Sequence, residues 1–238
     1  MGKERLDKLI ASMGRYSRRE AKELIRKGLV LVDGVPAESA EEKVDGEKAE
    51  ILVGGEDLGY RRFTYVMLHK PAGVLSATED ARQRTVLDLL PPPLRRMGLF
   101  PVGRLDKDTE GLLLLTNDGD LAHRMLSPKY HVDKVYYAEV DIPLDDSDVA
   151  AFAQGIALGG DLRCLPAGLR IGADAHQAFV TLHEGKFHQI KRMFASRGKS
   201  VLYLKRLSMG SLRLDEALQK GDYRYLTEDE VAKLYGDL

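Results

Sequence analysis

The chain reads GRLDKDTEG at residues 103–111 and continues directly into LLLLT at residues 112–116. The leucine run ends in a β-branched residue and is bounded by glycine and polar residues, which predicts a β-strand. The nine residues before it form the densest polar cluster that adjoins an apolar strand in this sequence. We therefore take this junction as the centre of the fold and as the first candidate site for chemistry.

The three acids of this segment, Asp106, Asp108 and Glu110, are open to three chemical interpretations. Paired carboxylates can cleave a glycoside, acids at alternate positions can hold Mg²⁺, and one carboxylate with a cationic partner can act as a nucleophile. Arg104 and Lys107 flank Asp106, and adjacent cations stabilise an ionised carboxylate, which favours the third interpretation. On composition alone, a polar turn without any chemistry is the simpler alternative.

Other common classes of site are not indicated. The six histidines show no zinc spacing with the single cysteine, Cys164, which has no partner for an internal disulfide. The glycines around Asp106 match neither nucleotide-binding fingerprint. The apolar runs are too short to cross a bilayer, and no secretory signal is visible. We therefore expect a cytoplasmic protein with no bound metal and no membrane anchor.

The first sixty residues predict a compact unit of two helices and a hairpin. Apolar residues at helical spacing end at Gly14, and Ser17-Arg18-Arg19-Glu20 has the form of a capping box that begins a second helix. Leu29–Val32 predicts a strand, Asp33-Gly34 predicts a hairpin turn, and Ile51–Val53 predicts a further strand.

Charge is distributed unevenly in this unit, although the whole chain carries a net charge of −1. Residues 1–30 hold nine Lys and Arg against four Asp and Glu, a balance of +5, whereas residues 31–60 hold two against nine, a balance of −7. Cations crowd one side of the second predicted helix at spacings that disfavour an isolated helix. These cations are Arg15, just before the helix, and Arg18, Arg19, Lys22 and Arg26. A solvated helix face is the plain alternative to a binding surface.

This order of helix, turn, helix and hairpin resembles the α-L RNA-binding motif of a small-subunit ribosomal protein and of tyrosyl-tRNA synthetases. The resemblance covers about Arg5 to Val53 and implies that the five cations contact RNA phosphates, which give affinity rather than sequence recognition. The glycine-containing segment Gly54–Gly59 is the best linker candidate. We therefore expect one domain over residues 1–58 and a second over residues 59–238.

The second domain predicts an α+β fold with a mixed, mainly antiparallel sheet flanked by helices. Strands and helices do not alternate regularly, which disfavours a doubly wound parallel sheet. The expected strands are residues 64–69, 112–116, 135–140, 178–182 and 200–207. The expected helices are residues 121–126, 146–154 and 188–197, with a C-terminal helix that begins at a capping box, residues 227–230.

Four segments of this domain resemble, in order, the motifs of ribosomal RNA pseudouridine synthases of the RsuA/RluB type. They are Lys70–Val74, residues 103–119, Lys134–Tyr136 and Glu184–Phe194. An appended α-L domain is usual in that family, so the resemblance covers nearly the whole chain. His69 is a departure, because the family pattern has Asn before the first segment.

The resemblance implies isomerisation of uridine to pseudouridine in structured RNA, with flipping of the target base and without cofactor or metal. Asp106 would carry the reaction, by covalent attack or by removal of a ribose proton, and the sequence leaves both routes open. Lys191 would pair with Asp106 and keep it ionised. Tyr136 would stack on the uracil and could take the C5 proton, whereas one of Tyr136 and Tyr137 is expected to be structural. Arg104 would contact RNA phosphate and fill the vacated space.

The expected partner is ribosomal RNA or a pre-ribosomal particle, bound by a monomeric enzyme. The stretch His123–Pro128, followed by Lys134–Tyr136, is similar to enzymes of small-subunit (16S) RNA. A large-subunit (23S) RNA enzyme stays open, because both specificities share these motifs. An RNA-binding assembly factor without catalysis is the rival from another class. The joint presence of Asp106, Tyr136 and Lys191 argues against it, since binding alone does not need them.

Overall fold

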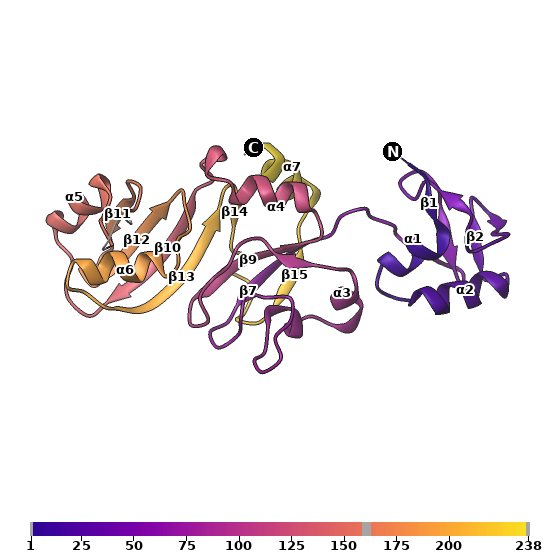
Figure 1. Cartoon of the computed structure of the whole chain (residues 1–238), viewed down its shortest axis with the longest axis horizontal. Helices are drawn as coiled ribbons and strands as arrows, with labels where there is room; N and C mark the ends of the chain where they lie inside the picture. Colours follow the sequence, from indigo (N-terminus) through magenta and orange to yellow (C-terminus); the bar gives the residue numbers. More distant parts are fainter. Residues whose placement is uncertain (1, 159–162, 237–238) are drawn as a thin grey trace. The chain divides into compact units, whose positions relative to one another are not determined.

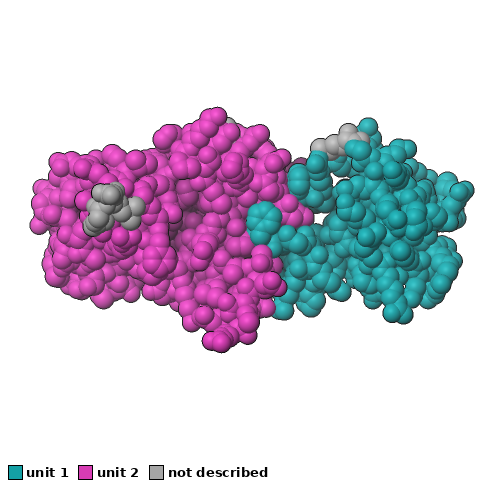
Figure 2. Space-filling view, viewed as in Figure 1, with its two compact units in different colours: residues 1–64, 90–100 teal, residues 65–89, 101–238 magenta. Residues whose placement is uncertain are grey.

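The computed structural model describes residues 2–158 and 163–236, and its chain divides into two compact units (Figures 1 and 2). Unit 1 comprises residues 1–64 and 90–100, and unit 2 comprises residues 65–89 and 101–238. Within the described ranges, no helix is long and apolar enough to span a membrane.

Unit 1 packs two short helices against small antiparallel sheets. Helix α1 (Leu6–Ser12) and helix α2 (Arg18–Arg26) each bury one apolar face in a shared core. The capping box predicted at Ser17 and Glu20 forms and begins α2. The strands pair as β1–β4 and as β3-β2-β5-β6. Their bounds are β1 (Glu4–Arg5), β2 (Val30–Val32), β3 (Val35–Pro36), β4 (Lys43–Val44), β5 (Ile51–Val53) and β6 (Glu56–Asp57). Unit 1 also holds α3 (Pro92–Arg96).

The glycines expected to form a linker instead form a hairpin turn. Gly54 and Gly55 have φ angles of 62° and 86° and join β5 to β6, where Val53 pairs with Glu56. Leu58 then enters the core of unit 1. Glycines with positive φ suit a tight turn as well as a linker, so composition alone could not separate the two. Because these glycines close a hairpin and Leu58 is in the core, the linker prediction was wrong. The domain boundary after residue 58 stays a prediction, and the first compact unit runs on to residue 64.

Unit 2 is built on a mixed sheet that has nine strands within the described residues. The order is β11-β12-β10-β13-β9-β7-β15, with β14 paired to β13 and β8 paired to β9. Strands β13 and β9 pair in parallel, whereas the other registered neighbours pair antiparallel, which confirms the predicted sheet. The bounds are β7 (Tyr65–Lys70), β8 (Phe100–Pro101), β9 (Glu110–Thr116), β10 (Lys134–Val140), β11 (Gly168–Ile171), β12 (Gln177–Leu182), β13 (Val201–Met209), β14 (Leu212–Arg213) and β15 (Tyr223–Tyr225).

Helices cover this sheet in two groups, which Figure 1 shows along its length. They are α4 (Gly119–Leu126), α5 (Asp146–Gln154), α6 (Gln189–Ser196) and α7 (Glu228–Gly236), with 3₁₀ turns at Val86–Leu89 and Pro128–Tyr130. Helices α5 and α6 meet through Phe152 and Phe194, whose ring centroids lie 5.0 Å apart in the core over β10–β13. Helix α7 is tied to the start of α4, because Tyr235 and Tyr65 both hydrogen-bond to Asp118.

The parallel pair β13–β9 joins the two halves of the sheet and sets the position of the loop before β9. Gly111 lies opposite Arg206 in this pair and has a φ of 105°. A Cβ at Gly111 would approach the Arg206 carbonyl oxygen to 2.2 Å, so the close approach of the strands requires glycine here. The polar segment 103–109 therefore ends on the strand that links both halves.

Candidate active site

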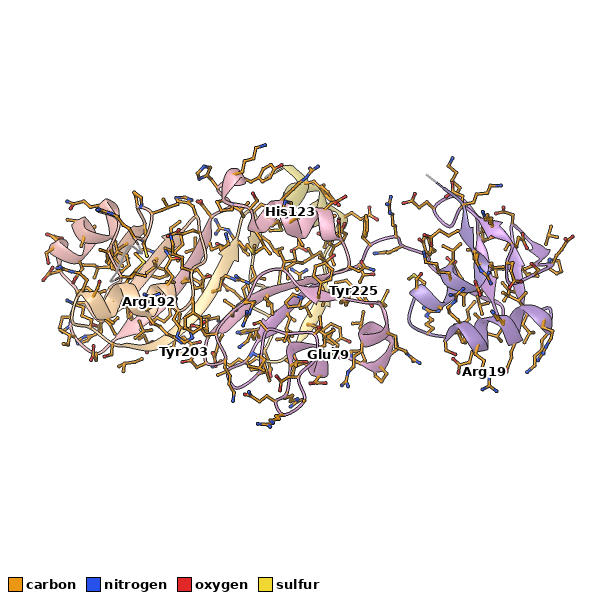
Figure 3. All side chains as sticks on the ribbon, viewed as in Figure 1. Arg19, Glu79, His123, Arg192, Tyr203 and Tyr225 are labelled. Atoms are coloured by element: carbon orange, nitrogen blue, oxygen red, sulfur yellow. The ribbon has the colours of Figure 1, made fainter. Side chains whose placement is uncertain are left out.

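Asp106 and Lys191 form an ion pair between the loop before β9 and helix α6. The Lys191 Nζ lies 3.1 Å from Asp106 Oδ2, and each side chain is 24% exposed. The pairing predicted from the sequence is therefore present, and it leaves the carboxylate reachable from solvent. Arg192, labelled in Figure 3, follows on α6 and donates to the Leu158 carbonyl over 3.2 Å, which fixes that face of the helix.

Asp108 shares the same ammonium group. Its Oδ1 lies 2.5 Å from Lys191 Nζ, although the Asp108 side chain is 73% exposed. The hydrogen bond from Lys191 lowers the pKa of Asp108, despite partial burial. Burial alone would lower the pKa of Lys191, but its bonds to Asp108 and Asp106 outweigh that effect and raise it. From the sequence, Asp108 was one of three acids open to several interpretations, and its contact with Lys191 was not predicted.

The third acid of the segment belongs to a different network of side chains. Glu110 Oε2 accepts a hydrogen bond from the Tyr203 hydroxyl at 2.6 Å and lies 2.7 Å from Lys220 Nζ. Tyr203, on β13, is labelled in Figure 3. The structure therefore separates Glu110 from the two aspartates that meet at Lys191.

A small cleft opens beside Asp106, with a water-accessible volume of about 80 Å³. Tyr136 lines it from β10 and is 9% exposed, and the exposed Arg104 lies at the same cleft. Tyr137 points to the other face of the strand, where its hydroxyl donates to Glu139 at 2.7 Å. Of the two tyrosines, Tyr136 is the one that faces the candidate site.

His188 is a second neighbour of Asp106 that sequence reasoning did not single out. Its Nε2 lies 3.7 Å from Asp106 Oδ1, and the residue precedes α6 with a left-handed φ of 50°. A non-glycine residue in that conformation is uncommon and often found at functional sites. The signal in the sequence was its place three residues before Lys191.

Lys70 supports the loop that carries Asp106 from beneath. The residue is fully buried, and its Nζ donates to the carbonyl oxygens of Pro71, Asp106, Lys107 and Thr109 at 3.1, 3.1, 3.2 and 2.8 Å. Burial lowers the pKa of Lys70 to about 8, against the opposing fields of nearby acids. The sequence contained Lys70 in a recognised segment, but the segment gave no sign that the amine faces the loop.

Two family descriptions match the chain. RNA pseudouridylate synthase matches residues 64–196, and the S4 domain matches residues 4–51. The chain belongs to the RNA pseudouridine synthase family. Its match to an uncharacterized RNA pseudouridine synthase of Bacillus subtilis is 49% identical and covers 95% of this chain and 96% of that protein. A crystal structure of a pseudouridylate synthase is 37% identical, with a TM-score of 0.69, and covers 97% of this chain and 99% of that one.

A further relative bears on the type of synthase. The ribosomal small subunit pseudouridine synthase A of Vibrio cholerae is 40% identical and covers 97% of this chain and 99% of that protein. The predicted resemblance to synthases of the RsuA type is therefore confirmed over the full chain. The S4 match likewise confirms the predicted N-terminal RNA-binding domain.

The cations of the S4 domain are partly held by acids of the same unit. Asp7 is fully buried, and its Oδ2 lies 3.0 Å from Arg18 Nη2 and 3.9 Å from Lys22 Nζ. A hydrogen bond from Arg5 is the main cause that lowers the pKa of Asp7. Arg18 and Lys22 are still 56% and 51% exposed. Sequence reasoning missed Asp7, because one acid at an apolar helix position does not show its partners.

The other predicted cations differ in their exposure and in their contacts with acidic side chains. Arg19 is 90% exposed, lies 3.6 Å from Glu23, and points away from the strands of unit 1 in Figure 3. Arg15 lies 3.8 Å from Glu56. Arg26 is exposed, and the described residues offer it no ion pair. A shallow hollow on α2 collects four of the five predicted cations. Their role as phosphate ligands stays a prediction.

The described residues hold no group of three or more His, Cys, Asp or Glu arranged to bind a metal. Asp106 and Asp108, the pair considered for Mg²⁺, both turn toward Lys191. Cys164 is buried and unpaired.

Replacing Lys70 by Met should lower the free energy of unfolding by about 1–3 kcal/mol, because the loop carbonyls lose their buried donor. Urea denaturation followed by circular dichroism would measure this change. Lys107→Met, at an exposed position of the same loop, is the matched control and should leave stability unchanged. Equal stability of both variants would show that Lys70 does not support the loop.

Proposed function

We propose that this synthase isomerises a uridine of small-subunit ribosomal RNA, with Asp106 as the reacting carboxylate and without a cofactor. The Asp106–Lys191 ion pair beside an open cleft is the observation that carries the chemical part. The choice of small-subunit RNA as the substrate is supported by full-length relatives in several bacteria, which are named ribosomal small subunit pseudouridine synthase A.

The reaction breaks the C1′–N1 bond of uridine, turns the uracil, and joins C5 to C1′. The C5 proton is then lost, and N1 gains a proton, so atoms balance without an external reagent. Asp106 can serve by adding covalently to the nucleoside and leaving again once C5 has joined C1′. Alternatively, it can take the ribose C2′ proton to give a glycal and return that proton when C5 joins C1′. In both routes Lys191 orients the carboxylate through the ion pair at 3.1 Å.

We propose that Tyr136, which lines the cleft, contacts the uracil. Its side chain belongs to the apolar core, which limits its motion, and the residue also lines the cleft. We assign it to stacking on the uracil and to the late loss of the C5 proton. Arg104, exposed at the cleft, would contact the phosphate beside the flipped nucleotide.

Pseudouridine mapping in ribosomal RNA from cells with and without this gene tests the proposal. Deletion should remove pseudouridine at a position in small-subunit RNA, and the wild-type gene, but not Asp106→Asn, should restore it. Loss at a large-subunit position would overturn the assignment of the subunit. An unchanged map would overturn the proposal that ribosomal RNA is the substrate.

The S4 domain is expected to contribute affinity through phosphates. Changing Arg19 and Arg26 to Glu in the full-length protein should weaken binding to small-subunit RNA and make its salt dependence shallower. In a plot of the logarithm of the binding constant against the logarithm of the salt concentration, the slope is negative. Its magnitude should decrease by about 0.9 for each phosphate that the variant no longer neutralises. Filter binding across a salt series measures both quantities. Lys48→Glu, at a site 84% exposed outside α2, is the control. A slope equal to that of the wild type would identify α2 as a solvated face.

A further inference from the structure

An aromatic pair stands at the edge of the candidate active site. The Phe187 ring stacks on the His188 ring, with centroids 3.8 Å apart and planes inclined by 19°. Of the large apolar side chains that the structure describes, Phe187 is the most exposed, at 74%. One exposed apolar side chain is ordinary by itself. Phe187, however, stacks on a residue of the candidate site, since His188 Nε2 lies 3.7 Å from the Asp106 carboxylate.

The segment that carries the pair is held by a hydrogen-bonded network. The Gln189 side chain, which is buried, accepts from the Lys186 backbone N–H at 2.8 Å and donates to Glu184 at 2.7 Å. Glu184 also accepts from the Leu165 backbone N–H at 2.9 Å. A ring presented by a fixed segment loses little freedom when a ligand stacks on it, which favours binding.

The two rings differ in their position relative to the cleft. His188 lines the cleft beside Asp106 and Tyr136, whereas Phe187 does not line it. A uracil inside the cleft would thus meet Tyr136 and His188, and the outer face of Phe187 would meet something outside. Unpaired bases stack on exposed aromatic rings in many RNA complexes, and every base offers a π-face for this contact.

We propose that Phe187, supported by His188, is a stacking platform for an unpaired base next to the target uridine. The proposal rests on the proposed function, because it assumes that the cleft receives a nucleotide of RNA. The platform would hold the strand beside the flipped nucleotide and thereby position the uridine over Asp106. Charge agrees with this occupant, since the exposed Arg104 lines the same cleft and can meet the phosphate.

Kinetics of full-length variants test the platform. Phe187→Ala should raise the KM for transcribed small-subunit RNA by about tenfold, with a smaller change in kcat, because stacking contributes binding. Phe187→Tyr should keep a KM near the wild-type value. Leu202→Ala is the matched control, since Leu202 is 70% exposed on β13 and lies outside the described cleft. A KM for Phe187→Ala equal to that of Leu202→Ala would overturn the proposal.

Fluorescence gives a second readout that does not need catalysis. The chain contains no tryptophan, so Phe187→Trp places a single indole on the proposed platform. Its emission should be quenched when small-subunit RNA binds. The same quenching is expected in the double variant that carries both Phe187→Trp and Asp106→Asn. Emission that saturating RNA leaves unchanged would overturn the proposal. Quenching that depends on protein concentration without RNA would also overturn it, because it would show that Phe187 contacts a second copy of the chain. Quenching without any pseudouridine formation by the Trp-free wild type would instead contradict the proposed function.

Discussion

Replacing Asp106 by Asn is expected to reduce tritium release from RNA labelled at C5 of uridine to the level of a reaction without enzyme. The amide keeps the size of the side chain but can neither attack as an anion nor accept the ribose proton, so both candidate routes fail. RNA binding should persist, because the loop keeps its backbone bonds to Lys70.

Asp108→Asn is the matched control for this result. It removes a carboxylate two residues away that contacts the same lysine, at 2.5 Å, but is 73% exposed. This variant should keep measurable turnover, since Lys191 still pairs with Asp106. Tritium release by Asp106→Asn at the rate of Asp108→Asn would remove Asp106 from its proposed role.

The second large effect is expected at Lys191. Lys191→Met removes the ammonium that contacts both aspartates, so kcat should fall by about 10²-fold. Without the cation, the Asp106 carboxylate loses the partner that lies 3.1 Å from its Oδ2 and orients it.

Two further measurements support the interpretation of this variant. The pKa of Asp108, which Lys191 lowers through its hydrogen bond, should rise toward the ordinary range and can be followed by carboxyl NMR. Lys191→Arg keeps a cation on α6 and should retain more of the wild-type kcat than Lys191→Met does. A kcat of Lys191→Met equal to that of the wild type would contradict a role for this ion pair in the reaction.

Local signals in the sequence predicted local structure well. The capping box at Ser17 and the turn at Asp33-Gly34 depend on a few neighbouring residues, and both form as predicted. Helix α5 has the predicted bounds, Asp146–Gln154. Short pieces such as β15 were missed, because Tyr223–Tyr225 becomes a strand only by pairing with β7. Three residues carry too little periodicity to predict that partner.

The site was only partly predictable for a related reason. Asp106 and Lys191 could be named through family motifs, and their ion pair joins residues 85 positions apart. Asp108, Lys70 and Asp7 acquire their roles from partners that tertiary folding supplies. A lysine whose amine meets four carbonyl groups has the same letter in the sequence as a solvated one. Such interactions follow from the packed structure and not from spacing along the chain.

We expect the purified chain to convert uridine to pseudouridine in small-subunit ribosomal RNA. The most direct test of this conversion incubates the protein with unmodified transcripts of small-subunit and large-subunit RNA, followed by carbodiimide treatment and reverse transcription. We expect a new stop at one position of the small-subunit transcript, absent with Asp106→Asn and absent from the large-subunit transcript. The absence of any enzyme-dependent stop in both transcripts and in small-subunit assembly particles would contradict this expectation.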